Sequence, residues 1–236
     1  MISLPVRPFV GVRSVQCLSG VFAALFFAAC ASTPVVPLTP ATSAQIDERT
    51  LKLQALESYK FNGGLGILTD EQNVSARVSW AKNADDLEVV LQGPLGIGRM
   101  QLTDANGTAM VTRGGKVVAQ GRSVDAVLMQ GLGLAAPVPV EQLKQWVIGL
   151  PGEAESVVTD VQGKLTSLEF ADAQGTRWLA EFPRYVDFDG LPVPGLITAT
   201  GGPYSIRLVL RSWQQNKPAA VPQKTEPDTR LAIPSG

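Results

Sequence analysis

The sequence predicts a mainly β fold in which one large antiparallel sheet is accompanied by a few helices. Apolar and polar residues alternate with a period of two in roughly ten or eleven short runs between residues 59 and 213. Helical spacing of apolar residues occurs in three segments. Because a twisted sheet of this size tends to curl, its concave apolar face needs a cover, and the helices are the candidates. The pattern leaves two interiors open: an unfilled, lipid-sized pocket or the packed core of a β-sandwich.

The first element expected in the folded region is a helix. Ser43 is a suitable N-cap for a helix over residues 44–58. Ile46, Leu53 and Leu56 give this segment an apolar stripe. The helix would therefore pack against the sheet along one side.

From Tyr59 onward the period of the apolar residues changes to two. Polar turns such as residues 70–73 and 104–107 separate the runs, and Gly114-Gly115 joins two of them into a hairpin. The expected strands are 59–67, 74–80, 87–91, 100–102, 108–113, 116–119, 156–161, 165–170, 177–182, 195–200 and 204–213.

Two helices are expected in the middle of the chain. Ser123 caps a short segment that extends to about Leu132. The second helix runs from Pro139, a residue that suits the first helical turn, to about Ile148, and Gly149-Leu-Pro-Gly152 ends it. Its apolar face comprises Val140, Leu143, Val147 and Leu150, with Trp146 beside them.

The N-terminal segment has the pattern of a bacterial lipoprotein signal. Arg7 and Arg13 precede an apolar run over residues 15–29, which is short for a membrane-spanning helix. Two alanines stand directly before Cys30, as at a lipoprotein cleavage site. We therefore expect residues 1–29 to be a signal peptide and Cys30 to carry the lipid. The alternative is an ordinary secretory signal in which Cys30 is incidental.

The residues after Cys30 indicate where a lipidated chain would be placed. Residues 30–43 are rich in Pro, Thr and Ala and form the expected tether. Ala31, and not Asp, follows the cysteine. In the usual sorting of bacterial lipoproteins, Asp at this position retains the protein at the inner membrane. The expectation is therefore a lipid-anchored protein on the periplasmic face of the outer membrane.

Charge and composition exclude several function classes. Residues 1–29 hold two of the 20 basic residues and none of the 21 acidic ones, so the remaining 207 residues carry a net charge of −3. This balance argues against a nucleic-acid partner. The other cysteine, Cys17, lies in the expected signal, so no disulfide can form after cleavage.

Motifs for catalysis or metal binding are missing from the sequence. It contains no histidine, which removes the commonest general base and metal ligand. Gly63-Gly64-Leu65-Gly66 lacks the spacing of a phosphate-binding loop, and no Gly-x-Ser-x-Gly occurs. Asp187-Phe-Asp189-Gly190 resembles the start of a calcium loop but lacks the later ligands. We expect no enzyme, no catalytic residue, no metal and no cofactor.

One turn carries an unexpected apolar residue. Pro94, Leu95 and Gly96 follow Gly93 between two expected strands, and a tight turn of this kind favours polar side chains. Leu95 either folds back onto the sheet or projects as an apolar finger towards a membrane.

Four segments resemble the LolB family of outer-membrane lipoprotein receptors, in the same order and with similar spacing over residues 45–213. They are Val-Ser-Trp80, Leu-x-Val-x-Leu-x-Gly-Pro-Leu-Gly96, Pro137-x-Pro-x-x-x-Leu-x-x-Trp-Val-x-Gly-Leu-Pro-Gly152 and Ile-Arg-Leu-x-Leu-x-x-Trp213. Phe27 at the cleavage site, where Leu is usual, and the Pro-rich tail at 214–236, expected to be disordered, depart from the family pattern.

The resemblance implies a fold and a function. Residues 44–213 would form a carrier domain, an incomplete antiparallel β-barrel with a helical lid that is similar to the periplasmic carrier LolA. Such a protein, expected here as a monomer, accepts lipoproteins from a LolA-like carrier and places their acyl chains in the outer membrane without nucleotide. Leu95 matches the family's projecting residue, which serves insertion. Other functions remain open: sequestration of lipid or lipophilic ligands, or a structural accessory subunit of the outer membrane.

The inward-facing apolar residues are the expected lining of an acyl-chain cavity, although any packed core would use the same residues. They are Val78, Trp80, Leu87, Val89, Leu91, Leu102, Leu143, Trp146, Ile206, Leu208 and Leu210.

Overall fold

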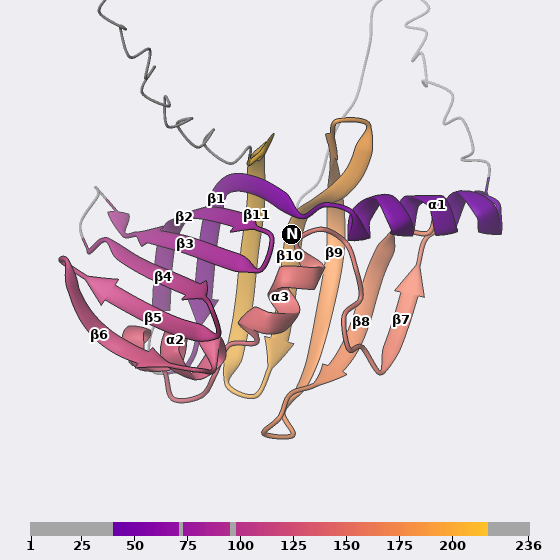
Figure 1. The fold of residues 1–236 in the computed structure, drawn as a ribbon. Helices are drawn as coiled ribbons and strands as arrows, with labels where there is room; N and C mark the ends of the chain where they lie inside the picture. The colour runs from indigo at the N-terminus through magenta and orange to yellow at the C-terminus, as the bar shows by residue number, and fades with distance from the viewer. Residues whose placement is uncertain (1–39, 71–72, 95–97, 217–236) are drawn as a thin grey trace, which may run out of the picture. The chain divides into compact units, whose positions relative to one another are not determined.

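A computed structural model describes residues 40–70, 73–94 and 98–216 (Figure 1). The elements are α1 (Ser43–Gln54), β1 (Ser58–Leu68), β2 (Asn73–Asn83), β3 (Asp86–Gln92), β4 (Met100–Ala105), β5 (Thr108–Arg113), β6 (Lys116–Gly121), α2 (Val124–Leu132), α3 (Val140–Trp146), β7 (Ser156–Thr159), β8 (Leu165–Ala171), β9 (Arg177–Phe188), β10 (Leu191–Gly201) and β11 (Tyr204–Gln215). Each of the expected strands and helices is present.

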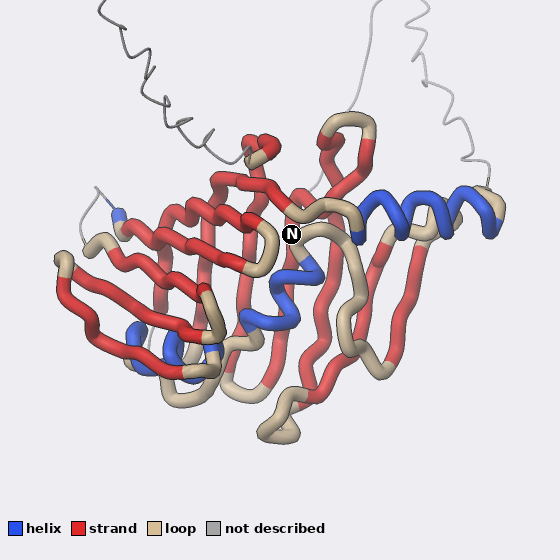
Figure 2. The backbone as a smooth tube through the Cα atoms, viewed as in Figure 1, coloured by secondary structure: helices blue, strands red, loops and turns tan. Residues whose placement is uncertain are grey.

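All of these strands belong to one antiparallel sheet. Its order is β6-β5-β4-β3-β2-β1-β11-β10-β9-β8-β7, so β1 pairs with both β2 and β11 and joins the two ends of the folded region. β6 and β7 are the two edges, and the sheet does not close between them. The strands curve around α2 and α3 (Figure 2). The predicted incomplete barrel is confirmed.

The register places apolar residues of neighbouring strands in rows on the concave face. One row runs from Phe61 through Trp80, Val89 and Leu102 to Val111, each paired with the next across the sheet. All five side chains are buried. The period-two alternation of the sequence therefore becomes one continuous apolar surface.

Local sequence sets the ends of the helices. Ser123 caps α2 by accepting a hydrogen bond from the Ala126 amide, as predicted. The prediction for α1 was wrong at both ends, since Thr42 and not Ser43 is the N-cap and the helix stops at Gln54. Thr42 and Gln45 form a reciprocal capping box, and strand pairing of β1 already begins at Ser58.

The β9–β10 hairpin is longer than the alternation predicts. Strands were expected over 177–182 and 195–200, but pairing continues to a turn at Asp189-Gly190. Both turn residues have positive φ, and the Asp187 Oδ1 atom accepts a hydrogen bond from the Gly190 amide. The acidic residues that resembled a calcium loop therefore shape a hairpin turn. Prolines and register shifts in β10 interrupt the alternation of apolar and polar residues, so the full length of the hairpin is not evident from the sequence.

Within residues 40–70, 73–94 and 98–216, none of the helices combines the length and apolar character needed to cross a bilayer.

Gly63 allows β1 to approach β11 closely. A Cβ at this position would overlap the carbonyl oxygen of Val209, whereas a Cβ on Gly64 would meet no atom within 4 Å. We expect Gly63→Ala to lower the free energy of unfolding by about 1–3 kcal/mol, because backbone must move. Gly64→Ala should change it by less than about 0.5 kcal/mol. Urea unfolding of both variants checks this, and equal midpoints would show that Gly63 is not sterically required.

Candidate functional site

An apolar cavity lies between the concave face of the sheet and the helices. Its volume is about 40 Å³, and every lining residue is apolar. The sheet contributes residues of β1–β4 and β11, and the cover comes from α2, α3 and the linker between them. We call this cover, residues 124–146, the lid. The lining comprises Leu65, Ile67, Val78, Trp80, Val89, Leu91, Leu102, Leu128, Val138, Val140, Leu143 and Leu208.

Seven of the eleven residues expected to line a cavity do so: Val78, Trp80, Val89, Leu91, Leu102, Leu143 and Leu208. Leu87, Trp146, Ile206 and Leu210 are buried in the surrounding core and do not reach this space. Trp146, for example, packs edge-on against Phe170 at 6.1 Å and donates its indole N–H to the Pro151 carbonyl at 3.3 Å. It therefore fixes the C-terminal end of the lid.

Sequence reasoning missed five lining residues: Leu65, Ile67, Leu128, Val138 and Val140. The alternation along β1 already placed Leu65 and Ile67 on one face, and helical spacing placed Val140 beside Leu143. The missing signal was the position of each helix over the sheet, which periodicity does not carry.

In this conformation the cavity is nearly filled by its own side chains. Ligand pockets in proteins usually measure about 300–1,000 Å³, far more than this one. Of the two interiors that the sequence pattern leaves open, the conformation described has the packed one and contains no lipid-sized pocket at this place. The physical reason is that opposed apolar surfaces lose contacts across a void, so Leu128 and Leu143 of the lid settle onto the sheet. An acyl chain can enter only if the lid moves.

The principal polar contact between the lid and the sheet is an ion pair. The Lys144 Nζ atom of α3 lies 2.7 Å from the Asp104 Oδ2 atom of β4, and the two side chains are 13% and 14% exposed. Burial alone would lower the pKa of Lys144, but hydrogen bonds to Asp104 and Glu141 outweigh it and raise this pKa. Tyr59 adds a hydrogen bond to the Lys144 carbonyl at 3.3 Å. α3 is thus fastened at its C-terminal turn.

Further hydrogen bonds hold the rest of the lid. The Asp125 Oδ1 atom of α2 accepts a hydrogen bond from the Glu141 amide at 3.2 Å and so links the two helices. Burial raises the pKa of Asp125. Tyr204 donates to the Ala136 carbonyl at 2.7 Å, and Arg113 donates to the Gly131 carbonyl at 2.7 Å. Few polar contacts therefore secure the lid, and apolar packing supplies the rest.

The predicted insertion loop and the predicted lipidation site lie mostly outside the residues that the structure describes. Pro94 is exposed after the end of β3, but Leu95, Gly96 and Cys30 lie outside the described residues. Their roles remain predictions.

Acidic side chains do not gather into a metal-binding arrangement in the described part of the chain. No group of three or more His, Cys, Asp or Glu residues there could hold a metal ion. The chemistry available at the candidate site is therefore apolar contact beneath the lid.

The two carboxylates that contact Lys144 provide a matched pair of variants. Asp104 is 14% exposed and Glu141 is 56% exposed. We expect Asp104→Asn to lower the free energy of local opening of α3 by about 1–3 kcal/mol, because a largely buried ammonium loses its charged partner. Glu141→Gln should lower it by less than about 0.5 kcal/mol. Amide hydrogen exchange in α3 measures both, and equal losses would contradict the assignment of Asp104 as the fastening residue.

Known proteins resemble this chain over the same region. The family model described as "Outer membrane lipoprotein LolB" matches residues 57–213. The outer-membrane lipoprotein LolB of Cellvibrio japonicus (strain Ueda107) is 29% identical over 202 residues, which cover 84% of this chain and 96% of that protein. LolB of Pseudomonas syringae pv. syringae (strain B728a) is 32% identical over 180 residues, covering 74% and 82%.

Among solved structures, a LolA superfamily protein from Nitrosomonas europaea has a TM-score of 0.49 and 9% identity and covers 76% of this chain and 96% of that one. The family match extends from the start of the sheet to its last strand and includes the lid and every residue that lines the cavity. The chain belongs to the LolB family of outer-membrane lipoproteins.

Proposed function

We propose that this chain accepts lipoproteins from a LolA-like periplasmic carrier and inserts their acyl chains into the outer membrane, without nucleotide. The observation that carries the proposal is the wholly apolar space between the sheet and a lid held by few polar contacts, in a member of the LolB family. Once the lid lifts, a space of this kind would take an acyl chain rather than a polar ligand.

The free energy of the cargo requires a direct transfer. Three acyl chains carry on the order of forty-five methylene and methyl groups, so exposing them to water would cost roughly 35 kcal/mol. The chains must therefore pass from one apolar environment to another. The difference between two such environments can be a few kcal/mol, where 1.4 kcal/mol corresponds to about a tenfold preference. No nucleotide is then needed.

Two residues outside the described part complete the proposal. Cys30 would carry the lipid that holds the protein at the periplasmic face of the outer membrane, where two or three acyl chains give stable anchoring. Leu95 would enter the bilayer surface near the anchor. Burying one leucine contributes about 2 kcal/mol, which is too little to anchor a protein but enough to perturb the bilayer locally. We propose a monomer that acts without a cofactor or catalytic residue.

The filled interior favours a second candidate function. A structural accessory subunit of the outer membrane needs no opening cavity, and a space of about 40 Å³ fits that role as it stands. It would co-purify stably with a larger assembly and take nothing from a loaded carrier. Membership of the LolB family favours the transfer function instead.

Transfer from a loaded carrier tests the proposal. The full lipidated chain in liposomes is mixed with a LolA-like carrier that holds a triacylated lipoprotein, and cargo is followed first onto this chain and then into the bilayer. Both steps are expected. If the carrier keeps its cargo, the transfer function is wrong and the accessory role remains.

The Leu95→Glu variant separates acceptance from insertion. We expect the variant to fold and to accept cargo within about twofold of the wild-type rate, while insertion falls at least tenfold, because a charge cannot enter the hydrocarbon layer. Leu179→Glu is the control, since Leu179 is an exposed apolar residue on β9. Insertion at the normal rate by the Leu95 variant would exclude the finger role.

A further inference from the structure

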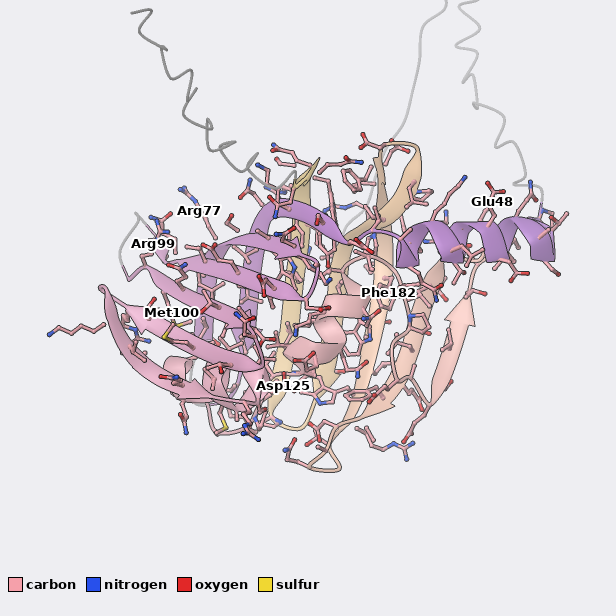
Figure 3. All side chains as sticks on the ribbon, viewed as in Figure 1. Glu48, Arg77, Arg99, Met100, Asp125 and Phe182 are labelled. Carbon is pink, nitrogen blue, oxygen red and sulfur yellow. The ribbon has the colours of Figure 1, made fainter. Side chains whose placement is uncertain are left out.

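A second apolar depression lies beside the cavity, at the end of the sheet where β3 stops and β4 begins. Its volume is about 310 Å³, and Val74, Ala76, Leu91, Met100 and Leu132 supply its apolar walls. Met100 and the exposed Arg99 mark this end of the sheet in Figure 3. Gly93 and Gly98, on either side of the β3–β4 loop, also line the depression. We call it the exit groove.

The exit groove continues the cavity along the concave face. Val78 pairs with Leu91 and Leu91 pairs with Met100, so one row of neighbouring side chains passes from the cavity into the groove. Leu91 lines both spaces. On the lid, Leu128 covers the cavity and Leu132, one helical turn later, covers the groove.

Arg113 closes the boundary between the groove and the lid. It occupies the next position of the same row, because Met100 pairs with Arg113. Its Nη2 atom donates to the Gly131 carbonyl at 2.7 Å and lies 4.0 Å from the Met100 sulfur. This bond ties the last turn of α2 to β5, at the point where α2 must lift if the two spaces are to join.

We propose that the exit groove is the path by which an acyl chain of the cargo passes between the cavity and the membrane, and that the Arg113–Gly131 hydrogen bond holds this path closed. The inference rests on the proposed function. The occupant is an acyl chain because the walls are mainly apolar, with Ser75 and Arg113 as the two polar lining residues, and because the groove adjoins the cavity. Its volume also lies within the usual range for ligand pockets. A larger hollow beside α1, about 440 Å³, does not suit this role. It shares no residue with the cavity, and its lining includes the basic side chains of Arg49, Lys52 and Lys164.

Removing the bond should open the path. We expect Arg113→Met, in the full-length chain, to bind the fluorescent C18 fatty acid cis-parinaric acid about tenfold faster than the wild type. If a probe binds only the open state, its observed binding rate rises in proportion to the population of that state. Arg99→Met is the control, because Arg99 is an exposed arginine beside the groove and, within the described residues, makes no hydrogen bond to the lid. An unchanged rate for Arg113→Met, or equal increases in both variants, would overturn the inference.

Site-specific cross-linking tests the path in cells, whether or not Arg113→Met folds. The photoreactive residue p-benzoylphenylalanine replaces Leu132 in the groove, Leu143 in the cavity or the exposed Leu179 on β9. We expect acylated lipoprotein to be captured from Leu132 and Leu143 but not from Leu179. Capture from Leu143 alone, or equal capture from all three positions, overturns the exit groove and leaves the proposed function standing. No capture from any position overturns both.

Discussion

The central constraint on this molecule is that its sheet curls without closing. β1 joins β2 to β11, yet β6 and β7 remain unpaired with each other, so the sheet cannot cover its own concave face. Two short helices, α2 with nine residues and α3 with seven, complete the enclosure. A cover that is not hydrogen-bonded into the sheet as a strand can lift while the sheet stays intact. The open topology thus separates a hydrogen-bonded wall, the sheet, from a helical cover that is packed against it.

The fold was largely predictable from the sequence because most strands have one apolar face. Period-two alternation identified these strands, and Ser123 and Pro139 marked the beginnings of the lid helices. The edge strands β6 and β7 do not alternate in this way. The β9–β10 hairpin was partly missed, since prolines in β10 break the alternation that reveals a strand. Where a register shift accommodates a proline in a strand, the alternation of apolar and polar residues no longer shows which residues pair with the neighbouring strand.

The candidate site was predictable only as a set of inward-facing residues. Alternation places Trp80 and Leu210 on the same side of the sheet, but it does not say which of them meets the lid. It also does not say whether the lid touches the sheet or stands away from it. Those properties depend on where the linker 133–139 places α3, and the tertiary contacts of Tyr59, Asp104 and Tyr204 decide that position. The closed cavity is consequently a property of packing that a local pattern cannot contain.

The closed state affects how tightly cargo can be held. If the cavity takes the acyl chain, as proposed, Leu128 and Leu143 must first leave their contacts with the sheet, and the Lys144–Asp104 ion pair must tolerate the movement of α3. This opening cost subtracts from the affinity, because ligand binds only the open fraction. A cavity that stood open would retain acyl chains more strongly and would release them more slowly. On the proposed function, a lid that packs onto the sheet favours the onward step into a bilayer, whose interior is at least as apolar as the cavity and needs no such rearrangement.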